Sequence, residues 1–302
     1  MTNAITQNLN HGYTAPSVGG MSDRAIERTF IVPTLLFLII FNVFPLLYSL
    51  FYSFTDFRAS SAEPARFIGL TNYRELLNDP AIWNNFVLTA KYVLLSVTGQ
   101  VVLGLGAALL LNRKIKFKGL ITTLMMLPMM MSTAVVGLFW KLLYNPSWGI
   151  VNYLTGLTDT IWLSNPDMAL IAIAITDIWM WFPFVMLLCL AGLSAIPPSI
   201  YEAAAIDRAS RWFVFTRITL PLVSPLLLIA IIFRTMEAFK TFDIAFVMAS
   251  MDETELVSIR LYNMAFQEWQ TGRSCALAYI VLIGVMVITN VYIRYLEQVK
   301  AR

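Results

Sequence analysis

The stretch IPPSIYEAAAIDRASRWFVFTRITLPLVSP, residues 196–225, interrupts a chain that is hydrophobic over most of its length. Ser199 and Glu202 have the S-x-x-E spacing of a capping box, in which both side chains accept backbone N–H groups at the start of a helix. The alanine-rich YEAAAIDR favours continuation of that helix. Ser210 is placed to cap a second short helix, and Pro221 is expected to end it, because a proline disfavours helix in the residue before it. The stretch therefore predicts two short, charged, amphipathic helices.

The composition on either side of this stretch indicates a membrane protein. Of 302 residues, 58% are hydrophobic and only 13% are charged, whereas about a quarter are charged in a typical soluble domain. A helix needs roughly 20 apolar residues to cross a bilayer. Each such run must be helical in lipid, because a backbone N–H or C=O without a hydrogen bond is costly there. We therefore expect an all-α membrane protein with six transmembrane helices. The six apolar runs are Phe30–Phe54, Phe86–Leu111, Leu120–Tyr144, Met168–Ser194, Leu222–Met248 and Cys275–Leu296.

The distribution of Lys and Arg predicts the orientation, because short cytoplasmic loops are enriched in these residues. The loop over residues 145–167 has neither residue, whereas the loop over residues 57–83 has mixed charges. Both termini and the loop over residues 196–221 are thus predicted to be cytoplasmic. Residues 1–22 are predicted to form a disordered cytoplasmic tail, and residues 23–302 the transmembrane domain. The basic residues on the cytoplasmic side are Arg24, Arg28, Arg113, Lys114, Lys116, Lys118, Arg208, Arg211, Arg217, Arg294, Lys300 and Arg302.

Several kinds of chemistry are disfavoured by the residues that the chain lacks. Its one histidine is His11, in the polar tail, so no HExxH zinc motif is possible. Cys189 and Cys275 lie in or beside apolar runs without metal-binding spacing. No GxxxxGK[ST] nucleotide-binding motif occurs. We expect no catalytic residues, no metal site and no cofactor bound by this chain, and we predict that it is not an enzyme. Composition leaves an intramembrane enzyme with an Asp-based site open as a third class of function.

The charged stretch itself allows two interpretations. It could lie on the membrane surface as an amphipathic linker, or it could dock a soluble partner. The small side chains of Ala203, Ala204 and Ala205 would allow another surface to approach closely, and Glu202 and Asp207 would offer charges at the rim. A docked helix would transmit motion to the spans on both sides.

The pattern EAAAIDRAS followed by ITLP resembles the EAA loop of binding-protein-dependent ABC importers. In that family the loop is a coupling helix that sits in a cleft of a separate ATPase subunit. Arg208 occupies the position where the family usually has glycine, so either its φ is negative or it adopts a conformation that glycine would take freely. The residues that match the family pattern are Glu202, Ala203, Ala204, Asp207, Ala209, Ile218, Leu220 and Pro221.

Four further segments are similar to the carbohydrate-importer branch of this family. They are FIGLTNYRELL (67–77), GLGAALLLNRKIKFKG (104–119), LPMMMSTAVVGLFWKLLYNPSWGIVNYL (127–154) and FRTMEAFKTFDIAFVM (233–248). The resemblance implies a type I ABC importer permease fold, in the first of two unlike permease subunits, in a bacterial inner membrane. It implies import of a sugar or sugar-like solute by alternating access. The implied partners are a second permease subunit, two ATPase subunits that hold ATP and Mg, and an extracytoplasmic solute-binding protein that contacts the outer loops.

Two ionisable residues inside the spans are candidates for the solute path. Ionisable residues are costly in a membrane, so those that occur there usually have a function. Asp177 lies about 15 Å from the outer end of its span and Arg234 about 20 Å from the inner end of the next, at 1.5 Å per residue. In a core about 30 Å thick, antiparallel spans would place them side by side, as a structural ion pair or on the solute path. Trp179, Trp181 and Phe182 could present ring faces to a sugar.

Glu237, Lys240 and Asp243 continue from Arg234 at a spacing of three residues with alternating charge. Such neighbours can neutralise one another along a helix, so we expect internal ion pairing, with Glu237 retained as a candidate for the solute path.

A stand-alone secondary transporter for a small polar solute is the alternative function. Such transporters commonly show internal repeats with broken helices, and no clear repeat is visible here.

Overall fold

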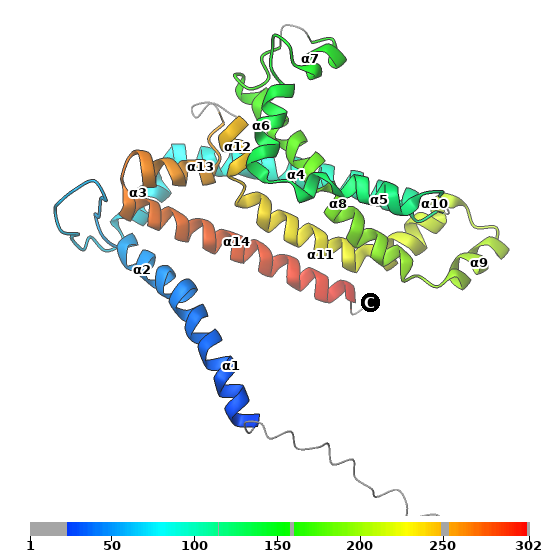
Figure 1. Ribbon diagram of the computed structural model, residues 1–302, viewed down its shortest axis with the longest axis horizontal. Coiled ribbons are helices and arrows are strands. Elements are labelled where there is room, and N and C mark those ends of the chain that lie inside the picture. Colours follow the sequence, from blue (N-terminus) through cyan, green and yellow to red (C-terminus); the bar gives the residue numbers. More distant parts are fainter. Residues whose placement is uncertain (1–22, 114, 158–159, 249–253, 301–302) are drawn as a thin grey trace, which may run out of the picture. The chain divides into compact units, whose positions relative to one another are not determined.

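The computed structural model describes residues 23–113, 115–157, 160–248 and 254–300 (Figure 1). The predicted tail over residues 1–22, with His11, and the basic residues Lys114 and Arg302 lie outside the described residues. The described secondary structure is helical apart from one antiparallel bridge between Thr55 and Phe67. The chain divides after Phe51 into two compact units, which are described separately.

The first unit contains one long apolar helix. It is built from α1 (Asp23–Leu38), a π-helical turn (Ile39–Val43) and most of α2 (Phe44–Ser53). Residues Arg28–Ser53 are apolar enough to cross a membrane. The large apolar side chains of this segment are mostly exposed.

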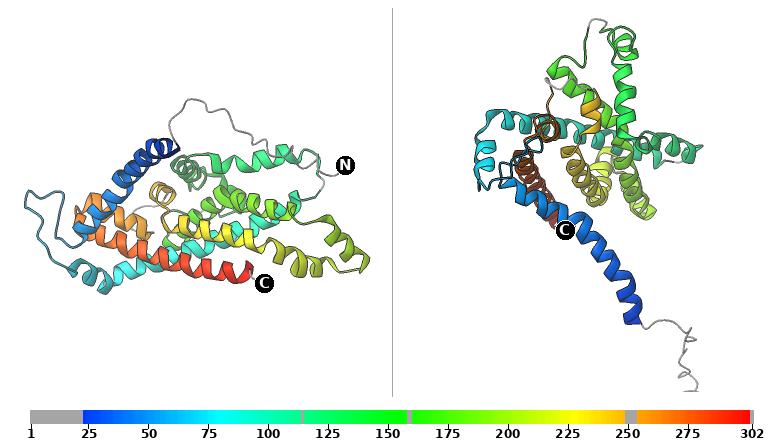
Figure 2. Two further views of the ribbon diagram at one scale, coloured as in Figure 1. Left: turned by 90° about the horizontal axis from the view of Figure 1, so that it is seen from below. Right: turned by 60° about the vertical axis from the view of Figure 1, so that its left-hand side comes forward.

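The second unit is organised around four long helices, which are α4 (Pro80–Leu111), α8 (Pro166–Ser194), α11 (Leu220–Phe239) and α14 (Thr271–Lys300). α4 and α8 pack along one another, and α11 contacts α4, α8 and α14 (Figures 1 and 2). A Cβ atom on Gly104 would lie 2.7 Å from Cβ of Val185 and 2.9 Å from the backbone N of Met186. Only glycine allows α4 to approach α8 this closely.

Shorter helices connect and cap the long ones. α3 and α13 lie at the end of the long helices opposite to α9 and α10, which the charged stretch forms (Figure 1). Their bounds are α3 Thr71–Asn78, α5 Lys118–Met126, α6 Thr133–Leu143, α7 Ile150–Thr155, α9 Pro198–Ile206, α10 Arg211–Phe213, α12 Asp243–Met248, α13 Val257–Tyr262 and η4 Asn263–Gln267.

Five helices among the described residues are long and apolar enough to cross a membrane, so the expected third span, Leu120–Tyr144, is wrong as a single helix. It is divided into α5 and α6 by a 3-10 turn at Pro128–Met130, after which Met131 and Ser132 are extended. Proline lacks the N–H that would continue α5. In Figure 1 the chain changes direction between α5 and α6.

The expected helix boundaries at Pro221 and Met248 are also wrong. A continuous apolar helix runs over Arg211–Phe239, through α10, a π-helical turn (Val214–Thr219) and α11, and α12 is a separate helix. Leu220 keeps helical angles before Pro221, because the proline follows the π-helical turn, where the hydrogen-bond spacing changes. Pro225 also lies inside α11 and has no N–H to donate to the carbonyl of Pro221, four residues earlier. The hydroxyl of Ser224 donates to that carbonyl instead, at 2.8 Å.

The two predicted helix caps have opposite outcomes. Ser199 is not an N-cap, because α9 begins at Pro198 with Pro197 at the N-cap position and no side-chain cap. A proline in the first turn has its φ preset for helix and needs no hydrogen-bond acceptor, which moves the start ahead of Ser199. Ser210 is confirmed as the N-cap of α10, where its Oγ accepts from the N–H of Phe213 at 3.2 Å.

Candidate functional site

One face of α4 carries a row of buried polar side chains. They recur at intervals of three or four residues, which places them on one side of a helix. None of them was predicted as a site residue, although this spacing of polar residues in an apolar run is readable from the sequence. The row consists of Asn85, Thr89, Tyr92, Ser96 and Gln100.

Gln100 joins Asp177 and Arg234 in a buried network between α4, α8 and α11. Its Nε2 donates to Asp177 Oδ2 at 2.8 Å, and its Oε1 accepts from Arg234 Nε at 2.8 Å. Arg234 Nη2 lies 3.3 Å from both carboxylate oxygens of Asp177. The side chains are 0%, 1% and 3% exposed in the order Gln100, Asp177, Arg234. The expectation that Asp177 and Arg234 lie side by side is confirmed.

Trp181 forms the other boundary of this network. The guanidinium carbon of Arg234 lies 4.4 Å from the centroid of the Trp181 ring, within the range of a cation–π contact. One face of this indole is therefore covered by Arg234. A sugar ring could not stack on that face while the contact holds.

A polar cavity of about 300 Å³ lies over the network. Four of the six residues predicted for the solute path line it, namely Asp177, Trp181, Arg234 and Glu237. The structure places the other two elsewhere, since Trp179 packs edge-on against Trp140 at 5.6 Å and Phe182 packs in an apolar cluster with α4. The remaining lining residues are Thr133, Lys240, Thr241, Phe242, Asp243 and Ile244.

The charged residues near the end of α11 are largely paired. Lys240 Nζ lies 2.9 Å from Glu237 Oε1, which confirms the expected ion pair. Asp243, at the start of α12, accepts a hydrogen bond from the hydroxyl of Thr133 on α6. The expected pairing of Asp243 with Lys240 is therefore replaced by a neutral donor.

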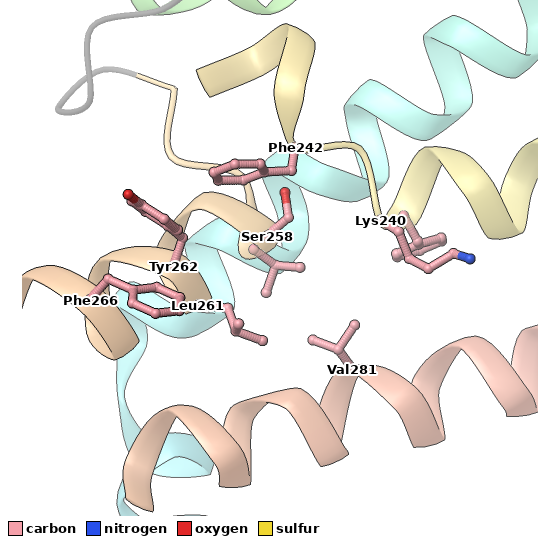
Figure 3. Close-up of a pocket in the computed structure, with 9 residues that line it drawn as sticks. Lys240, Phe242, Ser258, Leu261, Tyr262, Phe266 and Val281 are labelled. Carbon is pink, nitrogen blue, oxygen red and sulfur yellow. The ribbon is translucent and has the colours of Figure 1, made fainter. Parts of the chain in front are cut away.

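An aromatic pocket, also of about 300 Å³, adjoins the polar cavity and shares Lys240 and Phe242 with it (Figure 3). The rings of Phe242 and Tyr262 lie 5.0 Å apart, and those of Tyr262 and Phe266 lie 5.1 Å apart. Val281 of α14 faces these rings across the pocket. The site therefore combines a charged compartment with an apolar one.

The charged loop has a defined turn at the glycine-like position. Arg208 has φ +54°, so it adopts the left-handed conformation that glycine would take without strain. The N–H of Ala209 donates to the Ala204 carbonyl at 2.9 Å, and that of Arg208 to the Ala205 carbonyl at 3.1 Å. These two bonds make a Schellman motif, which ends α9.

The two sides of the predicted docking surface differ in exposure. Glu202, Ala203 and Asp207 are exposed, whereas Ala204 is buried within the loop, so the predicted row of accessible alanines is interrupted. A concave space of about 520 Å³ lies between α9 and α10. It is lined by Ile200, Ala203, Ala204, Asp207, Ala209, Ser210, Phe213 and Ile218, while Leu220 is half-buried and Pro221 exposed.

Comparison with known proteins places this arrangement in a family. The family described as binding-protein-dependent transport system inner membrane component matches residues 100–300. The chain belongs to this family. The permease is 33% identical to the trehalose/maltose transport system permease protein MalF of Thermococcus litoralis, over 87% of this chain and 91% of the relative. It is 32% identical to the sulfoquinovosyl glycerol transport system permease protein SmoG of Agrobacterium fabrum, over 92% of each chain.

Solved structures show the same fold for the permease. A bacterial ABC transporter involved in the import of the acidic polysaccharide alginate has a TM-score of 0.78 and 21% identity, over 91% of this chain and 96% of that chain. The MetNI methionine ABC transporter has a TM-score of 0.55 and 14% identity, over 74% of this chain and 99% of that chain. The expected type I ABC importer permease fold in a multi-pass membrane protein is thus confirmed.

In the permease, the loop and the buried network are connected by one helix. The helix over Arg211–Phe239 has 29 residues, about 43 Å at 1.5 Å per residue. It begins after the cap at Ser210 and carries Arg234 near its other end. Among the described residues, no three or more His, Cys, Asp and Glu side chains are grouped to hold a metal ion.

Proposed function

We propose that this permease translocates a sugar or sugar-like solute through a bacterial inner membrane by alternating access, as a subunit of an ATP-driven importer. The observation that carries the proposal is the polar cavity over the buried Gln100–Asp177–Arg234 network, joined by a continuous helix to the loop over residues 196–221. Relatives named for trehalose/maltose and sulfoquinovosyl glycerol transport support a solute with a sugar moiety.

The energy is supplied by separate subunits in this proposal, because the chain has no nucleotide-binding motif. Two ATPase subunits would hold ATP and Mg, and one of them would grip the exposed face of α9. Glu202 and Asp207 provide charges at the edge of that face, and the concave space between α9 and α10 admits a protruding side chain. Closure of the ATPases would move the loop as one body, because the Schellman motif and the Ser210 cap fix its two helices.

Two further partners complete the importer. A second, unlike permease subunit would enclose the solute path from the other side, and a solute-binding protein would deliver the solute at the outer loops around residues 57–83 and 145–165. A solved alginate ABC transporter in complex with a pentasaccharide-bound periplasmic protein supports such an arrangement. The excess of Lys and Arg in the loops on the side of residues 196–221 supports cytoplasmic termini.

Inside the cavity, the solute would meet groups that suit hydroxyls and groups that suit apolar ring faces. Asp243 and Thr241 offer acceptors and a hydroxyl, and Lys240 offers donors. Phe242 and the aromatic pocket offer ring faces, whereas one face of Trp181 is covered by Arg234. We therefore assign ring stacking to Phe242 in preference to Trp181.

A cross-linking experiment tests the docking role of the loop. Ala205→Cys, on the exposed side of α9, is expected to capture a nucleotide-hydrolysing subunit in membranes when a thiol–amine cross-linker is added. The matched control is Ser61→Cys in the exposed outer loop, which should capture none. Capture of no ATPase by Ala205→Cys, or equal capture by both variants, would refute the docking role.

A transport experiment separates the importer from a stand-alone transporter. The permease alone in vesicles is expected to carry no labelled trehalose or maltose, whereas the assembled importer with its binding protein and ATP should carry the sugar that the binding protein holds. Uptake by the permease alone would overturn the proposal.

A further inference from the structure

The polar cavity contains an unequal number of acidic and basic side chains. Three carboxylates line it, on Asp177, Glu237 and Asp243, against two cations, Arg234 and Lys240. Each cation has an acidic partner, since Arg234 contacts Asp177 at 3.3 Å and Lys240 contacts Glu237 at 2.9 Å. One negative charge remains, and it belongs to Asp243.

No cation among the described residues forms an ion pair with Asp243, an exposed residue in the first turn of α12. Its one described hydrogen bond comes from the hydroxyl of Thr133, which is neutral. Lys141 lies on the same helix as Thr133, but its Nζ donates to the Val247 carbonyl at 2.9 Å, one turn beyond Asp243 on α12. Lys141 is not among the residues that line the cavity.

Arg234 offers little capacity for an anion in this arrangement. Its Nε donates to Gln100 and its Nη2 to Asp177, while the face of its guanidinium covers Trp181. A bidentate contact with a carboxylate, sulfonate or phosphate needs two free N–H groups in fork geometry. Because Arg234 is only 3% exposed, such a contact would require the side chains that cover it to move.

We infer that the cavity selects uncharged, hydroxyl-rich solutes over anionic ones, and that Asp243 is the residue that determines this selection. A carboxylate only accepts hydrogen bonds, so Asp243 accepts from solute hydroxyls and repels a second negative charge. The inference rests on the proposed transport function for the statement that the occupant is a transported sugar. The charge of the cavity does not depend on that function.

The charge is measured by the reactivity of a thiol placed in the cavity. Thr241→Cys is introduced with Cys189→Ser and Cys275→Ser, and the permease in its membrane-embedded complex is treated with cationic and with anionic methanethiosulfonates. We expect the ratio of cationic to anionic rates to fall about fivefold on addition of Asp243→Asn, which is the effect of one unit charge about 8 Å away in water on a cation relative to an anion. Using the ratio before and after this change cancels the intrinsic reactivities of the two reagents.

The control is Glu297→Gln, an exposed acid near the C-terminal end of α14, which should leave the ratio unchanged. If Thr241→Cys does not assemble, Thr133→Cys provides a second lining position. A ratio that Asp243→Asn does not lower, or that Glu297→Gln lowers equally, overturns the inference whether or not the complex imports sugar. Loss of the proposed function has a different signature, because a complex that carries no sugar would still show the charge-dependent ratio.

Discussion

The buried pair of Asp177 and Arg234 predicts a large and strongly non-additive effect on stability. Asp177→Asn leaves Arg234 without its counter-ion, and Arg234→Gln leaves Asp177 without its own. Both side chains are almost fully buried, and removal of one partner from such a pair typically costs 3–5 kcal/mol. Each single variant is therefore expected to lose about 4 kcal/mol.

The double variant, Asp177→Asn with Arg234→Gln, removes both charges and retains polar groups that can bond to Gln100. No uncompensated charge remains, so we expect a loss of about 2 kcal/mol, set by weaker hydrogen bonds between neutral groups. The double variant should thus be more stable than either single variant. The coupling free energy between the two positions would be about 6 kcal/mol, above the usual range for contacting residues because both single variants leave a buried charge.

Thermal unfolding of the detergent-solubilised complex can be followed with a thiol-reactive dye, because Cys189 is fully buried and reacts only on unfolding. The partly exposed Cys275 is replaced by Ser in every variant. At about 2 °C per kcal/mol for a chain of this size, the single variants should melt about 8 °C lower and the double variant about 4 °C lower. Two single variants whose losses simply add in the double variant would refute the account of the network as an ion pair.

A matched control comes from the exposed pair Lys240–Glu237, whose side chains are 56% and 59% exposed. Exposed ion pairs contribute about 0–1 kcal/mol, so Glu237→Gln should change the midpoint by at most about 2 °C. A shift as large as that of Asp177→Asn would mean that the assay reports general damage and not the burial of charge.

The remaining predictions concern packing and coupling. Gly104→Ala should cost about 1–3 kcal/mol in the same thermal assay, because the added Cβ would meet α8 at under 3 Å. Gly106→Ala is the control, because there is open space at its Cβ, and it should cost less than about 1 kcal/mol. Arg208→Gly should stabilise the end of α9 by about 1 kcal/mol and preserve uptake, because it removes the strain at φ +54°; loss of uptake would mean that the Arg208 side chain itself is needed. Glu202→Lys should lower ATPase binding and uptake while membrane insertion, measured by cell fractionation, is unchanged; unimpaired uptake would contradict the docking role.

The sequence was sufficient to place Asp177 and Arg234 at the same depth. That prediction needed only the helical rise and the direction of the two spans, both of which follow from apolar length and loop charge. The i, i+3 pairing of Glu237 and Lys240 was predictable for the same reason, since it depends on a single helix. The same repeat failed for Lys240 and Asp243, because α11 ends at Phe239 and Asp243 lies on the separate helix α12.

Two of the failed helix boundaries depend on how prolines are accommodated. Pro198 was expected to precede a helix and instead begins it, and Pro221 was expected to end a helix that in fact continues. The second outcome depends on a π-helical turn and, for Pro225, on the Ser224 hydroxyl. Neither compensation follows from the residue type alone.

Contacts between helices were also beyond the sequence. The row of polar residues on α4 was visible, but only the packing of α4 against α8 and α11 shows that Gln100 bonds to both members of the ion pair. The stacking of Arg234 on Trp181 likewise depends on the relative rotation of α8 and α11. An aromatic residue near a predicted path is therefore insufficient evidence for contact with a sugar.

The network also explains how a movement of the loop would reach the solute path. The helix over Arg211–Phe239 is unbroken, so displacement of its start displaces Arg234. Arg234 is bonded to Gln100 on α4 and to Asp177 on α8, and opening these bonds would leave charges buried without partners, at several kcal/mol. Moving α4, α8 and α11 together avoids that cost. We therefore expect the three helices to rock as one body during transport, while the polar cavity opens and closes against α6 and α12, which contribute Thr133 and Asp243.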